Sequence, residues 1–168
     1  MLRSALSHRH ALRAALGALA IALLAYGLFK PAAAGRRTAP ALPAHVAAGA
    51  PVTLAKLRGH ATAVVFFASW CDGCHREGAA VARFANSVAG RGRVIAIDTS
   101  DGGDWRGFLS RYGWRFPVFR DANGLLSDSY DVHGLPTTVI IDPRGRIASS
   151  SAGAQTVAGL TSELAAAS

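Results

Sequence analysis

The chain has only two cysteines, and both follow directly after a long apolar run, an arrangement that restricts the possible folds more than any other feature. Residues 61–69 (ATAVVFFAS) carry no charge and are rich in β-branched and aromatic side chains, so they predict a buried central strand. From Cys74 onward the apolar residues recur with helical spacing. We therefore expect Cys71 on the turn between a buried strand and a helix, and Cys74 inside the helix.

The remaining residues alternate between expected strands and expected helices. A helix is expected over 74–89, with an apolar face formed by Val81, Phe84, Ala85 and Val88. Further strands are predicted at 93–98, 115–119, 137–142 and 146–150, and further helices at 104–112, 126–131 and 157–166. This order is typical of an α/β domain with a central mixed sheet flanked by helices, in which the first half is parallel and the last hairpin is antiparallel.

The N-terminal residues predict export from the cytoplasm. Three arginines precede an uncharged run of 16 residues, 14–29, which is typical of a signal peptide or membrane anchor within residues 1–34. We favour a retained anchor because Lys30 lies where cleavage would occur, while the small residues before Gly35 allow cleavage after Ala34. Residues 35–51, rich in Pro and Ala, are expected to form a linker, and residues 52–168 the folded domain.

The net charge of +8 does not predict nucleic-acid binding. Four of the 18 basic residues lie before Gly35, and the other 14 are accompanied by ten acidic residues in the body of the chain. The arginines of the body are scattered along the sequence, without the clustered stripe and interleaved aromatic residues of a groove-binding protein. We therefore expect a solvated, mildly basic surface and no nucleic-acid partner.

The spacing of Cys71 and Cys74 predicts reactivity rather than stabilisation. A disulfide across two intervening residues closes almost no loop, whereas the stabilising disulfides of exported domains close long ones. At a helix N-terminus the free N–H groups and the dipole stabilise a thiolate, so we expect the pKa of Cys71 below its usual value of about 8.5. Cys71 is thus the expected nucleophile and Cys74 the resolving thiol. The carboxylate of Asp72 opposes the thiolate and favours a less oxidising pair.

Two titratable residues next to the pair each have two possible roles. His75 either points to solvent, as we expect, or supplies positive charge to the cysteines when protonated. Glu77 lies three residues after Cys74. It either takes up or relays the proton of that thiol, or stabilises the first helical turn through the dipole.

A proline far along the chain is also expected to face the cysteines. The segment GLPTT, residues 134–138, introduces a predicted strand. A proline fits only at the start of such a strand, and a cis bond between Leu135 and Pro136 would turn unpaired backbone toward the cysteines. That exposed edge would be free to pair with an extended substrate peptide.

The stretches VTLAKLRGHATAVVFFASWCDGCHRE, VIAIDTSD and FPVFRDANGLLSDSYDVHGLPTTVIIDPRGRI together resemble the exported, often membrane-tethered thioredoxin-like proteins of the TlpA/ResA branch. W-C-x-x-C from Trp70 and G-x-P-T-T from Gly134 carry the resemblance. It implies a thioredoxin fold and a catalytic set made of a redox-active Cys71–Cys74 disulfide, cis-Pro136 and Glu77. The residues expected around this set are Trp70, Asp72, Gly73, His75, Leu135 and Thr137.

The resemblance also implies a function and a location. It implies reduction of protein disulfides outside the cytoplasm, commonly in apocytochrome c or at copper-site cysteines, with electrons from a membrane thiol transporter. We therefore expect a disulfide reductase on the periplasmic side of the bacterial inner membrane, anchored or soluble after cleavage, without cofactor or metal. Three positions depart from the branch: Gly73 stands where proline is usual, Val65 where a polar residue is often found, and Ala79 where a helix proline is common.

The same residues leave other chemistries open. Residues 71–75 also match C-x-x-C-H, the attachment pattern of a c-type haem, but the sole methionine is Met1. A second axial ligand would therefore have to be His45, His60 or His133. Zinc would need the two thiolates together with His60, His75 or His133. The main alternative function is a copper chaperone that binds Cu(I) at the dithiol near His133, and a peroxidase is the remaining enzymatic one.

Overall fold

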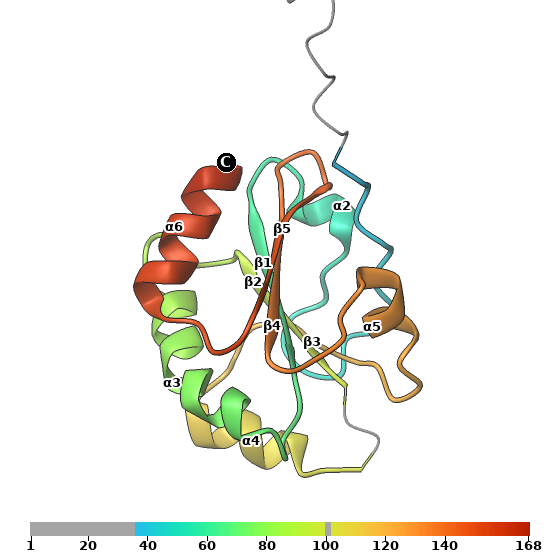
Figure 1. The fold of residues 1–168 in the computed structure, drawn as a ribbon, viewed down its shortest axis with the longest axis vertical. Coiled ribbons are helices and arrows are strands. Elements are labelled where there is room, and N and C mark those ends of the chain that lie inside the picture. Colours follow the sequence, from blue (N-terminus) through green and yellow to red (C-terminus); the bar gives the residue numbers. More distant parts are fainter. Residues whose placement is uncertain (1–35, 100–101) are drawn as a thin grey trace, which may run out of the picture. The chain divides into compact units, whose positions relative to one another are not determined.

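The computed structural model describes residues 36–99 and 102–168, which belong to a compact unit that begins at Arg36 (Figure 1). The predicted signal or anchor, residues 1–34, lies outside the described residues. Within the part that is described, no helix is long and apolar enough to cross a membrane. The unit contains the whole region in which the sequence predicts alternating strands and helices.

Five strands form a mixed sheet in the order β3-β2-β1-β4-β5. The strands are β1 (Thr62–Phe67), β2 (Val94–Asp98), β3 (Val118–Arg120), β4 (Thr137–Ile141) and β5 (Ile147–Ala152). β1, β2 and β3 are parallel to one another, whereas β4 is antiparallel to both β1 and β5. The predicted α/β fold, with a parallel first half and an antiparallel final hairpin, is therefore confirmed.

Helices cover both faces of the sheet (Figure 1). They are α2 (Leu54–Leu57), α3 (Asp72–Asn86), α4 (Trp105–Tyr112), α5 (Leu125–Tyr130) and α6 (Val157–Ala167). α3, α4 and α6 lie on one face, and α2 and α5 lie on the other. Because β1 is the central strand between these two layers, all of its residues are buried.

The side chains of β1 divide between two hydrophobic cores, because successive residues of a strand point to opposite faces. Val65 and Phe67 join the core beneath α3, α4 and α6. Val64 and Phe66 join the core beneath α2 and α5. The ring of Phe67 packs against Trp114, with ring centroids 5.0 Å apart. This packing holds the carboxyl end of β1, from which the cysteine loop leaves the sheet.

Helix α3 differs from its predicted extent at both ends. It begins at Asp72, two residues earlier than expected, which makes Cys71 its N-cap. It ends before Ser87, whose hydroxyl donates to the Phe84 carbonyl (2.7 Å) in place of a continuing helical turn. Val88, predicted on the apolar face, therefore follows the helix and is 95% exposed. The prediction for Val88 is wrong.

The segment predicted as a linker, residues 35–51, packs against the domain over its described part. The backbone N–H of Ala47 donates to the Val118 carbonyl at the edge of the sheet (2.7 Å). The hydroxyl of Tyr130 donates to the Pro40 carbonyl (2.8 Å), and burial raises the pKa of Tyr130 to about 12, so this donor keeps its proton at neutral pH. The predicted boundary between linker and domain is therefore wrong: a Pro- and Ala-rich composition does not distinguish a free tether from an extended segment bound to its neighbours.

Candidate active site

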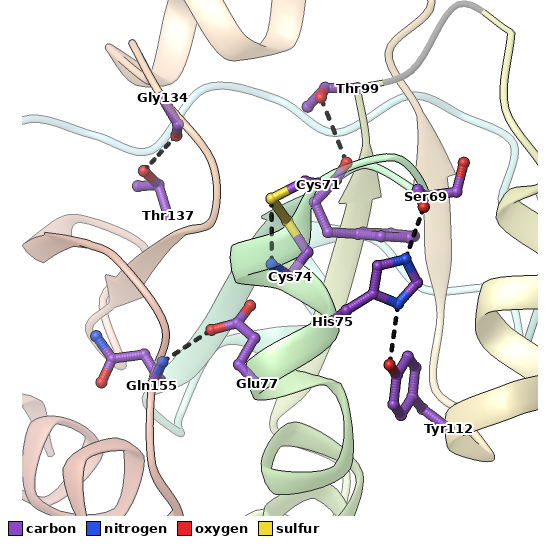
Figure 2. Close-up of a disulfide and its surroundings, with 11 residues drawn as sticks. Ser69, Cys71, Cys74, His75, Glu77, Thr99, Tyr112, Gly134, Thr137 and Gln155 are labelled. Carbon is purple, nitrogen blue, oxygen red and sulfur yellow. Dashed lines mark hydrogen bonds between the residues drawn. A yellow bond between two sulfur atoms is a disulfide. The ribbon is translucent and has the colours of Figure 1, made fainter.

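The loop between β1 and α3 places both cysteines at the start of the helix (Figure 2). Cys71 is the N-cap residue, and its Sγ accepts a hydrogen bond from the backbone N–H of Cys74 (3.1 Å). The two side chains form a disulfide, and their Cα atoms are 5.2 Å apart. The predicted location of the pair, at the junction of a buried strand and a helix, is therefore confirmed.

The surroundings of the two sulfur atoms differ in ways that matter for reactivity. A thiolate on Cys71 would keep the N–H bond from Cys74 and would lie at the positive end of the α3 dipole, and both interactions stabilise negative charge on sulfur. Cys71 is 6% exposed, whereas Cys74 is 0% exposed. A sulfur atom of another protein therefore has access to Cys71 and not to Cys74.

The buried carboxyl group of Glu77 lies on the same side of α3 as Cys74, one helical turn further on (Figure 2). Its Oε2 accepts a hydrogen bond from the backbone N–H of Gln155 (2.9 Å), while its Oε1 has no hydrogen-bond partner among the described residues. Burial raises the pKa of Glu77 to about 7, although the hydrogen bond from Gln155 acts in the opposite direction. Glu77 therefore changes protonation near neutral pH.

The location of Glu77 contradicts one of its two predicted roles. It is the sixth residue of α3 and is 0% exposed, whereas the acidic residue in the first turn is Asp72. A fully buried carboxyl group beyond the first turn does not serve the helix dipole, so that alternative is wrong. Burying a carboxyl group is costly, and such groups are concentrated at functional sites.

Pro136 meets the start of α3, and the bond between Leu135 and Pro136 is cis. A Cβ atom on Gly73 would lie 2.7 Å from Cδ of Pro136 and 3.7 Å from Sγ of Cys71. The two loops are thus in direct contact beside the disulfide, at a distance that leaves no room for a side chain at position 73. The glycine that departs from the branch pattern is what permits this close approach.

A hollow of about 330 Å³ opens beside Cys71. Its walls include Trp70, Thr99, Val132, Gly134 and Leu135. Trp70 is 67% exposed, so its ring is available to a second molecule at this surface. The Thr137 hydroxyl donates to the Gly134 carbonyl (2.7 Å), which holds the loop that forms one wall (Figure 2). The loop and Cys71 therefore border one shared surface.

His75 is half-buried and bonded within the protein, so the expectation that it points to solvent is wrong (Figure 2). Its Nε2 lies 2.9 Å from the carbonyl oxygen of Ser69, and its Nδ1 lies 2.9 Å from the hydroxyl oxygen of Tyr112. Because a carbonyl oxygen only accepts hydrogen bonds, Nε2 is the protonated nitrogen and donates a hydrogen bond to the carbonyl oxygen of Ser69. His75 thereby ties the start of α3 to the loop before Trp70 and to the end of α4.

Sequence reasoning missed several residues of this site. Tyr112 is 37 positions from His75, and Gln155 is 78 positions from Glu77. No local pattern connects residues so far apart, and Gln155 contributes a backbone N–H, which every residue except proline has. Thr99 and Val132 were missed as well, although Val132 lies only two residues before Gly134, so the walls of the hollow could have been extended from the predicted proline loop.

In residues 36–99 and 102–168, the two cysteines are not part of a larger cluster of metal-ligating side chains. Among the described residues, no group of three or more His, Cys, Asp and Glu side chains is placed to hold a metal ion. His133, which was considered for copper, lines the same hollow as Cys71, but it is exposed and hydrogen-bonded to Asp131 (2.9 Å). A c-type haem would need a free nitrogen of His75, whereas both of its nitrogens are bonded to Ser69 and Tyr112. The site therefore favours dithiol chemistry.

A mixed sheet with a C-x-x-C disulfide at a helix N-terminus and a cis-proline beside it defines the chain as a thioredoxin-like protein. Solved structures agree with this class. A putative thiol:disulfide interchange protein DsbE from Chlorobium tepidum is 25% identical and superposes with a TM-score of 0.67, covering 79% of this chain and 96% of that one.

The model of the AhpC/TSA family matches residues 36–150, and the chain belongs to this family. The thiol-disulfide oxidoreductase ResA of Bacillus subtilis is 30% identical over 101 residues, which are 59% of this chain and 56% of that protein. The protein of the same name from Oceanobacillus iheyensis is 32% identical over 108 residues, 63% of this chain and 56% of that protein. The chain thus spans little more than half the length of these relatives.

We predict that replacing Glu77 with Gln removes a pH dependence from the stability of the oxidised protein. The folded protein raises the pKa of Glu77 from 4.5 to about 7. The stabilisation that the protonated Glu77 gives the folded state is therefore fully present below pH 4.5 and is lost as the pH rises through 7. Over this window the free energy of unfolding should fall by up to roughly 3 kcal/mol in the native protein and not in the Glu77→Gln variant. Urea unfolding at about pH 4 and about pH 8 measures both changes. Equal changes in the two proteins would contradict the prediction.

Proposed function

We propose that the chain is an exported thiol–disulfide oxidoreductase that reduces disulfides in other proteins through Cys71 and Cys74. The observation that carries the proposal is the position of Cys71, whose sulfur caps α3, accepts the N–H of Cys74 and is the more exposed of the two. The printed names of the ResA relatives and of the Chlorobium tepidum structure describe the same kind of chemistry for those proteins.

The first proposed step joins the enzyme to its substrate. The Cys71 thiolate attacks one sulfur of a substrate disulfide, so a Cys71–substrate disulfide forms and the substrate's own S–S bond breaks. The other substrate sulfur leaves as a thiolate and takes a proton from water. The N–H of Cys74 and the α3 dipole stabilise Cys71 as the attacking anion, because both act on its Sγ.

The second proposed step releases the substrate. The Cys74 thiol gives its proton to the carboxylate of Glu77 and attacks Sγ of Cys71, which restores the Cys71–Cys74 disulfide and frees the second substrate thiolate. Two electrons thereby pass from the dithiol to the substrate. Glu77 suits this role because Cys74 is shielded from water and the pKa of Glu77 is about 7, close to the pH at which the proton must move.

Substrate is proposed to bind where the proline loop and the hollow meet the disulfide. The loop at Leu135–Pro136 lies against Gly73 and therefore presents its backbone next to Cys71. An extended peptide can pair with such an edge, while the hollow walled by Trp70 and Val132 accepts a neighbouring side chain. This arrangement favours a protein or peptide disulfide over a small molecule as the substrate.

Two acidic groups near the pair favour reduction over oxidation, whereas the guanidinium of Arg76, which lies beside Gly73 near Cys71, acts in the opposite direction. The exposed carboxylate of Asp72 directly follows Cys71, and the carboxyl group of Glu77 is buried one turn beyond Cys74. Negative charge at both positions disfavours a thiolate, and a pair whose thiolate is less stabilised is a weaker oxidant.

The proposed location follows from the N-terminal residues, which lie outside the described ones. The uncharged run at 14–29 supports export and anchoring on the periplasmic side of the bacterial inner membrane, or a soluble periplasmic protein after cleavage at Ala34. There the pair would be re-reduced by a membrane thiol transporter, and cysteines of apocytochrome c or of copper sites would be its substrates.

The Cys74→Ser variant is expected to accumulate mixed disulfides between Cys71 and substrate proteins, because the thiol that releases them is missing. Non-reducing gels of cells that express the variant, followed by mass spectrometry, would detect these complexes. The matched Cys71→Ser variant keeps a thiol at position 74 and should trap nothing. Absence of reductant-sensitive complexes with Cys74→Ser would refute the proposed exchange.

Replacing Glu77 with Gln should slow the release step by about 100-fold at neutral pH, because Cys74 loses its proton acceptor. The rate of that step should also lose its rise with pH around 7, where Glu77 ionises in the native protein. Stopped-flow tryptophan fluorescence during reaction with a disulfide peptide measures the rate, with Trp70 made the sole tryptophan by Trp105→Phe and Trp114→Phe in every protein compared. Glu163→Gln is the matched control, since Glu163 is bonded to Ser151 away from the cysteines. Equal rates in the two variants would exclude Glu77 from proton transfer.

In intact cells with a permeabilised outer membrane, Cys71 and Cys74 are expected to be mainly reduced, and Cys71, the more exposed of the two, is expected to react with a membrane-impermeant maleimide. A reductase must hold its pair as the dithiol, and an exported domain must meet the reagent. Mass shifts after acid quenching report both the redox state of the pair and its exposure to the reagent. A pair found mainly as the disulfide would indicate an oxidase, and dithiols that only a permeant reagent labels would exclude export.

A further inference from the structure

The fold gathers basic residues at the end of the sheet opposite the cysteines. Because β1, β2 and β3 are parallel, the residues that precede them share one end, while the cysteine loop follows β1 at the other. Lys56 and Arg58 precede β1, Arg91 and Arg93 precede β2, and Arg115 precedes β3. Scattered along the sequence, these residues become neighbours only through the strand order.

The turn between β4 and β5 adds more positive charge at the same end. Pro143 in this turn accepts a hydrogen bond from the N–H of Gly59 (2.9 Å), which places Arg144 and Arg146 beside the loop that contains Arg58. Arg36, the first described residue, forms an ion pair with Asp142 (3.5 Å) at the start of the turn. These three residues and the five named above are called the basic end.

Few carboxylates offset the basic end. Asp142 is buried and is already paired with Arg36 and Arg146, and Glu163 on α6 lies in the same shallow hollow as Arg36. None of the ion pairs among the described residues involves Lys56, Arg58, Arg91, Arg93, Arg115 or Arg144. The other end holds most of the remaining acidic residues: Asp72, Asp98, Asp104, Asp121, Asp128 and Asp131. Arg76, Arg106, Arg111 and Arg120 also lie at that end and offset part of its negative charge, so the domain is more positive at the basic end than near the cysteines.

We propose that the basic end binds the anionic lipid headgroups of the membrane, so that the cysteines face away from the bilayer. The proposal goes beyond the redox chemistry and rests on the proposed export and anchoring. Six of the eight basic residues are exposed, and lysine and arginine near an anionic bilayer surface are attracted to it. The binding surface is a set of loops with charged tips, which suits a headgroup layer.

The point at which the chain enters the domain identifies a membrane, in preference to an acidic protein, as the partner. Arg36 belongs to the basic end, and the uncharged run ends at Phe29, seven residues earlier. Seven extended residues span at most about 25 Å. A membrane that holds this run is thus within reach of the basic end, whereas the screening length at physiological salt, about 8 Å, requires close approach for attraction.

Hydrogen exchange of the full chain in lipid nanodiscs tests the proposal. With phosphatidylcholine and about 30 mol% phosphatidylglycerol, amides of residues 55–60 and 144–147 should exchange at least about threefold more slowly than in phosphatidylcholine alone. About 0.5 M salt, where the Debye length falls to ~4 Å, should abolish the difference. Arg58→Glu with Arg144→Glu should remove the protection. The control Arg106→Glu with Arg111→Glu, two exposed residues of α4 near the cysteines, makes the same charge change and should retain it.

The results separate binding by the basic end from anchoring by the N-terminal residues. Equal exchange in the two lipids, or equal protection of the two double variants, would overturn binding by the basic end even if the chain stays in the nanodisc. A chain that separates from nanodiscs during gel filtration would refute the anchor alone. In that case, hydrogen exchange would be measured with an excess of vesicles of the same anionic lipid. Lack of protection of the basic end in those vesicles would overturn the proposal.

Discussion

The site depends on one constraint: β1 is covered on both faces, so the chain must leave the sheet abruptly at its carboxyl end. The turn in which the N–H of Cys71 donates to the Ala68 carbonyl (3.2 Å) accomplishes this, and α3 begins at the next residue. The first free N–H groups of the helix therefore lie at the cysteine sulfur. Packing of Phe67 beneath α3 and α4 keeps that junction in place, so the chemistry of the pair is a consequence of how the central strand is buried.

The site also contains a carboxyl group, that of Glu77, whose burial costs free energy. Glu77 gains one hydrogen bond, from Gln155, and leaves one oxygen unpaired, which does not offset the loss of hydration. An apolar residue of similar volume would avoid this cost, and the buried acid is one of the observations that support the proton transfer proposed above for Cys74. A carboxylate at Glu77 and a thiolate at Cys74 are both negative and disfavour each other, so the protonation states of the two groups are linked.

The order of the parallel strands also separates basic from acidic side chains within the domain. Parallel strands place the residues that precede them at one end and the residues that follow them at the other. Arginines spaced too irregularly to form a pattern in the sequence thus gather opposite the cysteines, while aspartates that cap helices and end strands gather near them. The parallel strands thus account for the position of the reactive end and for five of the eight residues of the basic end, which also contains Arg36, where the chain enters the domain.

Local pattern was sufficient for most of the fold and for the two sulfur atoms. The apolar run of β1, the helical spacing after Cys74 and the glycines and prolines of the last hairpin each act within a few residues, which is the range over which sequence periodicity reports burial. Other features depend on particular hydrogen-bond partners. Helix α3 ends at the hydrogen bond of Ser87, and residues 36–51 are held by Tyr130. His75 is turned inward by Tyr112, and the buried Glu77 is bonded to Gln155. Three of these four partners are distant in the chain. The sequence by itself thus determined which residues could react, whereas only the tertiary structure decided their solvation and hydrogen bonding, because dielectric environment and partner geometry arise from segments that meet only in the folded protein.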